Sequence, residues 1–288
     1  MATSEAPPPS ADRPSLANAP LFYAAPKRSF LARQTDVWIA FFGRMGQVFD
    51  MTIGTVRAMF RRPIEWRAFI DQLEALGVAS LGIVSVTSLF IGMVMSVQFA
   101  FGLSKFGGME YTGRVVGLSF ARELAPTLTA VIVGGRIGAG MAAEVGAMSV
   151  TEQIDAVRAL GADPLKKLVL PRLIASIVVM PILALIALVL GFMGAMFITE
   201  IEFGIPASFF LSSALTSIGM TDFVSGIFKT PFFGAIIAIV GCHYGLTTRG
   251  GTAGVGNSTT STVVVIAITI LIADLFLTKL AIALFPYL

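Results

Sequence analysis

Charged residues are scarce in this chain of 288 residues: Asp, Glu, Lys and Arg make up 13% of it, whereas hydrophobic residues make up 56%. Soluble domains are usually about one quarter charged, so the composition argues against a soluble domain. In lipid, only helices and closed barrels satisfy every backbone polar group. The apolar runs are continuous rather than alternating, which favours helices over a barrel. We therefore expect an all-α integral membrane protein.

Cysteine and histidine are also nearly absent, since Cys242 and His243 are the only residues of their types. A single cysteine cannot form an intramolecular disulfide. A metal site or a histidine-based catalytic centre needs further ligands or partners, so we expect no metal and no catalytic residue, and interpret His243 as a packed or interfacial side chain. The formal net charge of +3 requires no nucleic acid, because membrane topology itself distributes basic residues.

The chain divides into three regions. Residues 1–30 are rich in Pro, Ala and Ser and are expected to be a disordered tail, without the apolar segment of a signal peptide. Residues 31–72 are expected to hold an amphipathic interfacial helix and an elbow, because apolar residues recur at three- and four-residue steps over 37–60 until Pro63. Residues 73–288 are the expected transmembrane domain.

Five apolar stretches are long enough to cross a hydrocarbon core, which needs about 20 residues. They cover residues 75–104, 115–143, 173–199, 222–246 and 260–285. The segment 204–221 contains Pro206, Gly219 and many hydroxyl side chains. We interpret it as an interfacial or re-entrant helix rather than a sixth span.

The positions of Lys and Arg predict the orientation. If the N-terminus is cytoplasmic, fourteen of them lie on the cytoplasmic side, and only Lys105 and Arg114 lie in the outer loops. The positive-inside rule favours that orientation. It places the C-terminus on the opposite side and two segments, residues 144–172 and 247–259, in the cytoplasm.

The second of these segments contains GGTAGVGNSTTS at residues 250–261, which has P-loop spacing. A P-loop needs a lysine where this chain has Asn257, and it needs a strand before the loop rather than a membrane span. We interpret the match as coincidence. The glycines are expected to form a tight turn, with Ser258, Thr259 and Thr260 capping the fifth span.

The first segment reads AEVGAMSVTEQIDAVRALGADPLKKLVLPR at residues 143–172. A short helix is expected over residues 152–160. Gly161 would end it, and Asp163 and Pro164 would begin the next helix as N-cap and first-turn residue. The segment would then project from the membrane domain as a helix–turn–helix.

This string resembles the coupling-loop motif of ABC transporter permeases, although Val157 occupies a usually small position and fewer residues separate Gly161 from Pro171. The alternative is an ordinary inter-helix loop, because short motifs are weak evidence. The matching residues are Asp155, Ala156, Gly161, Leu170 and Pro171. The residues expected to contact an ATPase are Glu144, Glu152, Asp155, Arg158, Leu160 and Gly161.

Longer stretches extend the resemblance. They are FIGMVMSVQ at 90–98, RELAPTLTAVIVGGRIGAGMAAEVGAMSVTEQIDA at 122–156, the GADPL turn, and STTSTVV in the last span. Together they resemble the MlaE-type permease family, the membrane subunits of bacterial phospholipid-transporting ABC systems. The resemblance covers roughly residues 64–288 and leaves the Pro-rich tail outside.

The resemblance implies a permease homodimer, a cytoplasmic ATPase dimer, a periplasmic ring of MCE-domain protein and often a small STAS-domain subunit. ATP and Mg²⁺ would bind the ATPase, and this chain would bind no cofactor and catalyse no reaction. The implied substrate is phospholipid, moved between the inner membrane and a periplasmic carrier to maintain outer-membrane lipid asymmetry. The implied location is the bacterial inner membrane, with a cytoplasmic N-terminus and a periplasmic C-terminus.

Ionisable residues inside the spans are costly and usually face a cavity or a partner. Arg122 and Glu123 in the second span and Lys229 in the fourth lie at similar depths. In a structural interpretation, Glu123 pairs with Lys229, or Arg122 pairs with Asp222. In a functional interpretation, which is compatible with the first and which the resemblance supports, Arg122, Glu123 and Lys229 line a lipid cavity near the outer leaflet. Asp274 in the fifth span has no partner evident from the sequence.

The apolar part of such a cavity would come from the first span, whose Met and Phe side chains offer an adaptable surface for acyl chains. The expected lining residues are Met93, Val97 and Phe99. Ordinary packing or lipid-facing positions are an equally good interpretation of each one alone. Arg136 would extend to the membrane interface, and the small residues of GGRIGAGMAA around it would allow close helix packing.

Two other functions remain open from the sequence. An ion- or proton-coupled secondary transporter could use Glu123, Lys229 and Asp274, but it predicts inverted repeats, and no repeat is visible among the five spans. A non-transporting membrane scaffold or a membrane enzyme is the other alternative. An enzyme would need a nucleophile–base pair or a metal cluster, and the sequence suggests neither.

Overall fold

The structure is a computed structural model that describes residues 46–47, 49–55, 57 and 66–285. The expected tail over residues 1–30 and the helix end at Pro63 lie outside the described residues. The chain separates into the units Met1–Gly46 and Gln47–Leu288. Only Gly46 of the first unit is described, and all other described residues belong to the second.

Five helical segments among the described residues are long and apolar enough to cross a membrane, which confirms the all-α fold with five spans. The first is α2 (Trp66–Ser104). The second joins η2 (Met109–Tyr111), α3 (Thr112–Ser119), the π-helix η3 (Phe120–Leu128) and α4 (Thr129–Val150). The third joins the π-helix η4 (Leu165–Val169) to α6 (Leu170–Phe203). The last two are α8 (Met220–Leu246) and α9 (Gly251–Leu284).

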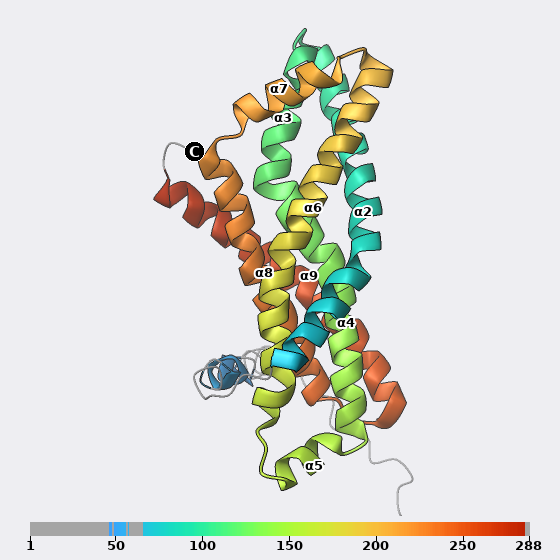
Figure 1. The fold of residues 1–288 in the computed structure, drawn as a ribbon, viewed down its shortest axis with the longest axis vertical. Helices are drawn as coiled ribbons and strands as arrows, with labels where there is room; N and C mark the ends of the chain where they lie inside the picture. The colour runs from blue at the N-terminus through green and yellow to red at the C-terminus, as the bar shows by residue number, and fades with distance from the viewer. Residues whose placement is uncertain (1–45, 48, 56, 58–65, 286–288) are drawn as a thin grey trace, which may run out of the picture. The chain divides into compact units, whose positions relative to one another are not determined.

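The span boundaries differ from expectation at two helix starts. Helix α2 begins at Trp66, because the end of the region expected to be an elbow is continuous with the first span. Helix α9 begins at Gly251, nine residues before the expected start of the fifth span. Figure 1 shows the two ends of this helical unit, with α5 (Gln153–Ala159) at one and α3 with α7 (Ala207–Ser217) at the other.

Close backbone packing holds α2 against α6. A Cβ atom added to Gly92 would collide with the carbonyl oxygen of Gly191, and one added to Gly194 would collide with that of Leu89. Glycines allow two membrane helices to approach this closely. The pairing extends to a buried hydrogen bond between the hydroxyls of Ser96 and Thr199.

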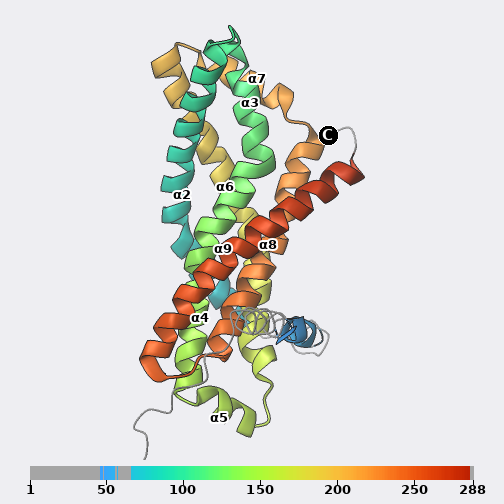
Figure 2. The ribbon, with the colours of Figure 1, turned by 180° about the vertical axis from the view of Figure 1, so that it is seen from behind.

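Helix α4 packs against both α8 and α9, and Figure 2 shows α9 crossing in front of the other helices. The expected role of its small residues is confirmed, because a Cβ at Gly134 would lie 2.9 Å from Ile237 of α8 and one at Gly138 would collide with Ile266 of α9. Ile237 and Ile266 are fully buried. The core of the unit therefore includes the seam where these three helices meet.

Helix α7 accounts for the segment 204–221. It has 11 residues and is about 16 Å long at 1.5 Å per residue, which is too short to span a bilayer. It packs on α3, where Gly113 and Gly117 approach Phe210 and Ala214. The prediction that this segment is not a sixth span is confirmed.

Part of the expected amphipathic helix is described, and residues 46–47, 49–55 and 57 are helical. Its inward face carries Met51 and Thr55, which are buried, whereas Phe49 is 65% exposed. Gly54 lies close to Leu165 at the start of η4. Phe49 thus leaves an apolar side chain free on the outer face.

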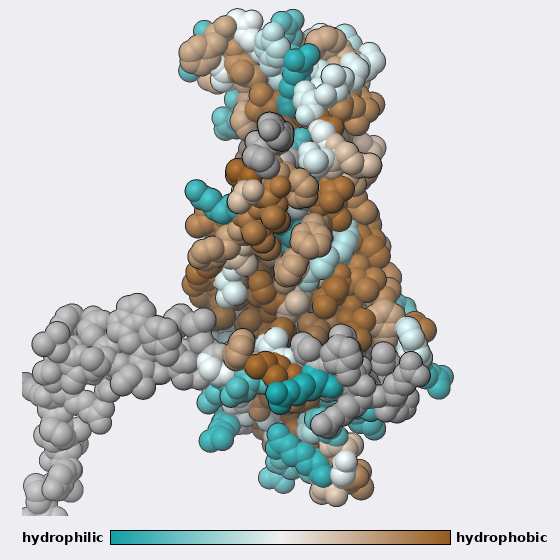
Figure 3. All heavy atoms as spheres, turned by 90° about the vertical axis from the view of Figure 1, so that its left-hand side faces the viewer, coloured by the Kyte–Doolittle hydropathy of each residue, from teal (hydrophilic) through white to brown (hydrophobic). Residues whose placement is uncertain are grey.

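The described surface is consistent with a membrane-spanning unit. Figure 3 shows apolar residues in a broad band and hydrophilic residues gathered below it, near α5. Large exposed hydrophobic side chains occur along α2, α6, α8 and α9, for example Phe90 on α2 and Phe276 on α9. A surface of this kind is stable in lipid and not in water.

Candidate functional site

The site begins with an irregular turn in the second span. Arg122 and Glu123 lie in η3, a nine-residue π-helix that contains Pro126. Proline has no N–H to donate and disfavours a regular α-helical turn, and π-helical turns are frequent at functional sites. The wider turn directs these two adjacent side chains to different partners on α8.

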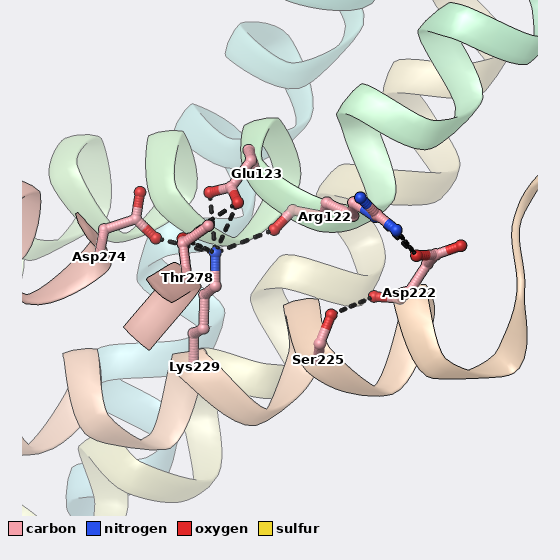
Figure 4. A network of polar contacts seen from close by, with 7 residues as sticks. All are labelled: Arg122, Glu123, Asp222, Ser225, Lys229, Asp274 and Thr278. Atoms are coloured by element: carbon pink, nitrogen blue, oxygen red, sulfur yellow. Dashed lines mark hydrogen bonds and ion pairs between the residues drawn. The ribbon is translucent and has the colours of Figure 1, made fainter. Parts of the chain in front are cut away.

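Lys229 is the centre of the charge cluster, which we define as Arg122, Glu123, Asp222, Lys229 and Asp274. Its Nζ atom lies 2.8 Å from each Glu123 carboxylate oxygen and 3.1 Å from Asp274 Oδ1. The lysine side chain is only 4% exposed. Figure 4 shows it reaching from α8 toward carboxylates on η3 and α9. An ammonium buried this deeply requires such partners.

Hydroxyl and backbone oxygens complete the coordination of Lys229. The ammonium donates to Thr278 Oγ1 at 2.7 Å and to the carbonyl oxygen of Arg122 at 3.3 Å. Thr278 also donates to Glu123 Oε1 at 3.1 Å. Asp274 and Thr278 are four residues apart and therefore share one face of α9.

The second ion pair of the cluster joins Arg122 to Asp222. Arg122 donates from Nε to Asp222 Oδ1 at 2.6 Å, and its Nη2 contacts the same oxygen. The other oxygen of Asp222 accepts the backbone N–H of Gly219 at 2.9 Å, so this carboxylate also caps the start of α8. Arg122 remains partly exposed, at 29%.

Both pairings expected from the sequence, Glu123 with Lys229 and Arg122 with Asp222, are confirmed. The partner of Asp274, which the sequence did not reveal, is Lys229. The cluster has three carboxylates and two cations, so each cation already has an anionic partner. A bound phosphate would have to compete with those carboxylates.

The first-span residues lie apart from the cluster within one chain. Met93, Val97 and Phe99 are half-buried on α2, which packs mainly along α6, whereas the cluster joins η3, α8 and α9. Within the described part of one chain, these three residues and the cluster therefore belong to different helix contacts.

The projection at the other end of the second span matches its prediction. Helix α5 covers Gln153–Ala159, close to the expected 152–160. Gly161 ends it with φ +77°, a left-handed conformation that glycine adopts without strain. Asp163 then accepts the backbone N–H of Leu165 at 3.0 Å, which confirms its expected capping role.

Charged and apolar side chains are exposed on this projection. Arg158 donates to Asp155 at 2.8 Å, and both side chains are more than half exposed. Leu160 is 87% exposed. Glu144 lies elsewhere, because it pairs with Arg172 at the start of α6 at 2.9 Å. Glu144 thus supports the base of the projection rather than its tip.

A polar cleft of about 640 Å³ separates α5 from the turn between α8 and α9. Glu152 lies on its wall with φ +59°, the only non-glycine residue with positive φ among those described. Such strained conformations persist where surrounding structure imposes them and are common at functional sites. Other lining residues include Gln47, Ser149, Ile154, Asp155, Arg158, Thr248 and Arg249.

The glycine-rich segment is a helix rather than a loop. The turn itself is short and ends at Gly250, with φ +90°, and Gly251, with φ +68°. Residues 251–258 form the first turns of α9, so they cannot cradle phosphates as a P-loop does, in agreement with the prediction of a coincidental match.

The capping prediction for this segment is wrong. Thr259 and Thr260 lie inside α9 and donate to the carbonyl oxygen of Gly256. Ser258 forms a 2.8 Å hydrogen bond with Thr248 in the turn. The glycine run had suggested a longer turn because glycine disfavours helices, but only the first two glycines adopt positive φ.

The two rare residues are structural. Cys242 is a buried free cysteine, and His243 is 7% exposed with its ring edge-on to Tyr244. The expectation of a packed histidine is confirmed. No group of three potential metal ligands occurs among the described residues.

Comparison with known proteins gives a family for this architecture. Residues 69–280 match the family described as Permease MlaE. A probable ABC transporter permease protein of Synechocystis is 40% identical over 83% of this chain and 91% of its own length. A probable ABC transporter permease protein of Rickettsia bellii is 38% identical over 82% of this chain and 91% of its own.

A plant relative is equally similar but longer. The chloroplastic protein Trigalactosyldiacylglycerol 1 of Arabidopsis thaliana is 40% identical over 78% of this chain, and the match spans 64% of the plant protein, less than two thirds of its length. The family match covers most of the described spans, including η3, α5 and most of α9. The chain therefore belongs to the MlaE permease family and is the non-catalytic, multi-pass membrane subunit of an ABC transporter.

Proposed function

We propose that this permease moves phospholipids between the inner membrane and a periplasmic carrier, and so maintains outer-membrane lipid asymmetry. The observation that carries the proposal is the charge cluster, which lies among apolar spans while Glu123 and Arg122 remain 38% and 29% exposed. A phospholipid has an anionic head and apolar tails, and this surface offers polar and apolar contacts side by side. The Arabidopsis relative, whose name contains that of a glycolipid, supports a lipid substrate.

Two copies of the chain would form the lipid cavity. Met93, Val97 and Phe99 are only half-buried, so a second copy could complete a wall that one chain leaves open. A two-fold interface builds such a volume from two half-walls. Arg122, Glu123 and Lys229 would then lie near the head-group end, on the periplasmic side.

The projection around α5 would dock into a groove on the partner ATPase, through Glu152, Asp155, Arg158, Leu160 and Gly161. In the proposed orientation, α5 and the N-terminus lie in the cytoplasm and the C-terminus lies in the periplasm, in agreement with the distribution of Lys and Arg. A periplasmic ring of MCE-domain protein would receive the lipid, and a STAS-domain subunit would complete the assembly. ATP and Mg²⁺ would bind the ATPase alone.

Lipid transfer from proteoliposomes to an MCE-protein acceptor tests the substrate proposal. Glu123→Arg would place a second cation beside Lys229, and Lys229→Glu would place three carboxylates together. We expect both variants to impair transfer while they still copurify with the ATPase, since α5 lies at the far end of the spans. Normal transfer by both would remove these residues from the lipid path. Transfer that requires an ion gradient rather than ATP would favour a secondary transporter.

A second measurement tests the assignment of the nucleotide to the partner. Photo-crosslinking with an azido-ATP analogue should leave residues 250–261 of the isolated chain unlabelled, because they lack the P-loop lysine. The partner ATPase serves as the positive control. Specific labelling of this segment, displaced by ATP, would contradict the proposal.

A further inference from the structure

Arg136 is a cation inside the second span without a carboxylate partner among the described residues. It is exposed on α4, and Nη1 donates to Ser80 Oγ of α2 at 2.9 Å. Ser80 in turn donates to the carbonyl oxygen of Leu76 at 2.6 Å. A guanidinium has five N–H donors, so one neutral oxygen leaves most of them available to an anion.

The depth of Arg136 suits a lipid head group of the leaflet at the α5 end. Glu144, which pairs with Arg172 at the start of α6, follows eight residues later, or about 12 Å along the helix. A long arginine side chain can cover part of this distance, which brings its guanidinium group close to the membrane interface. Phosphate groups occupy that level of a bilayer.

A shallow apolar groove begins one helical turn from this arginine. It lies between α2 and the η3–α4 segment, with Val84 on one wall and Ile132 on the other. Arg136 follows Ile132 by four residues and Ser80 precedes Val84 by four, so the pair continues both walls toward the α5 end. The remaining residues that line it include Thr87, Ile91, Leu124, Leu128 and Ala187.

Open space lies on the other side of the arginine. Gly140 is exposed one turn beyond Arg136, and a Cβ added there would meet no atom within 4 Å. A head group could therefore sit over Gly140. The groove encloses only about 10 Å³, which suits an acyl chain lying against the surface rather than an enclosed molecule.

We propose that Arg136, Ser80 and Gly140 form a binding site for the phosphate of an anionic phospholipid, with one acyl chain in the groove between α2 and η3. The groove runs toward Leu124, next to Glu123. A lipid bound at this site would therefore lie on the route to the charge cluster. That role rests on the proposed function, whereas lipid binding itself does not.

A second copy of the chain is a less suitable occupant. Arg136 would need an anion from it inside the membrane, and the three carboxylates within the apolar stretches of the spans already pair with cations of their own chain. Glu144 is likewise paired with Arg172. An anionic lipid supplies the missing charge and the apolar chain together.

Quenching by brominated lipids tests this site on the full chain in vesicles. Ile132→Trp would report on the groove in a chain whose two native tryptophans are removed by Trp38→Phe and Trp66→Phe. Brominated phosphatidylglycerol should quench this tryptophan at about tenfold lower mole fraction than brominated phosphatidylcholine, because both lipids carry a phosphate but the choline cation of the second repels the guanidinium of Arg136. The measurement needs neither ATPase nor transport, so its outcome is independent of the proposed function.

Three variants and a control sharpen the result. Arg136→Gln should abolish the preference and Arg136→Lys should retain part of it. Gly140→Leu should weaken it by filling the head-group space without removing charge. Gly82→Leu is the control, since Gly82 also has open space and lies two residues, or about 200°, around α2 from Ser80. An unchanged preference in Arg136→Gln would overturn the proposal, and so would a tryptophan that neither lipid quenches, which would show that protein covers the groove.

Discussion

The charge cluster and the α5 projection both contain ion pairs, but in opposite surroundings. Lys229 is 4% exposed and contacts two carboxylates, whereas Arg158 and Asp155 are 61% and 68% exposed and contact each other. Removing one partner from a buried pair costs about 3–5 kcal/mol, and an exposed pair contributes about 0–1 kcal/mol. The same chemistry therefore makes the fold depend on the presence of every partner in one region and leaves side chains free for a partner in the other.

Lys229→Met should give the largest effect, because it leaves Glu123 and Asp274 facing each other without a cation. We expect a loss of about 3–5 kcal/mol in the free energy of unfolding, measured by denaturant titration in detergent. The triple variant Lys229→Met, Glu123→Gln, Asp274→Asn should recover most of that loss. A triple variant as unstable as the single one would show that packing by Lys229, rather than its charge, stabilises the region.

Gly161→Val should lower the free energy of unfolding by less than Lys229→Met does. It should nevertheless distort the projection more than a change at Asp155 would. Gly161 has open space around it but a φ of +77°, so the cost is backbone strain of about 1–2 kcal/mol. We expect ATP hydrolysis to be uncoupled from lipid transport while membrane insertion persists. Gly256→Ala, in open space within α9, is the control and should be neutral or stabilising by about 0.5–1 kcal/mol. Equal losses from both changes would contradict the strain argument.

Thr248→Val removes the hydrogen bond to Ser258, together with one to the carbonyl oxygen of Tyr244, and keeps the shape of a side chain that is only 4% exposed. The expected loss is about 1 kcal/mol, because this bond joins the α8–α9 turn to the first turns of α9. Thr247→Val is a matched control, since Thr247 is exposed and bonds only within its own helix end. If the two variants unfold at the same denaturant concentration, the bond to Ser258 contributes nothing.

Replacing Asp155 and Arg158 together with Ala should change stability least, by less than about 0.5 kcal/mol for an i,i+3 pair. It should nevertheless uncouple the ATPase from transport, because these side chains would contact the partner. Copurification and coupled ATP hydrolysis are the readouts. Wild-type values for both would place the docking surface elsewhere on the chain.

Much of this architecture was predictable because it depends on local patterns. Uncharged runs predicted the five spans, and the order of Gly161, Asp163 and Pro164 predicted the end of α5 and the next helix start. The pairing of Glu123 with Lys229 could be inferred from their similar depth. These features require only the helical repeat and the thickness of a bilayer.

Other features depend on contacts between distant segments, which one sequence does not reveal. Asp274 reaches Lys229 only because α9 crosses α8, and the sequence does not specify that crossing. Ser258 was expected to cap the fifth span, but α9 already begins at Gly251. The hydroxyl of Ser258 instead forms a hydrogen bond with Thr248 of the preceding turn. Arg136 was expected to extend to the interface, and its contact with Ser80 requires the packing of α4 on α2.

The π-helical segment over Phe120–Leu128 has a geometric consequence for the whole second span. A π-turn accommodates roughly one residue more than an α-turn, and one residue corresponds to a rotation of about 100°. Everything after Leu128 is therefore turned relative to α3, which lets α3 present Gly113 to α7 while α4 presents Gly134 and Gly138 to α8 and α9. Deleting one residue within 120–128 would tighten the turn to a regular helix and put one of these two interfaces out of register.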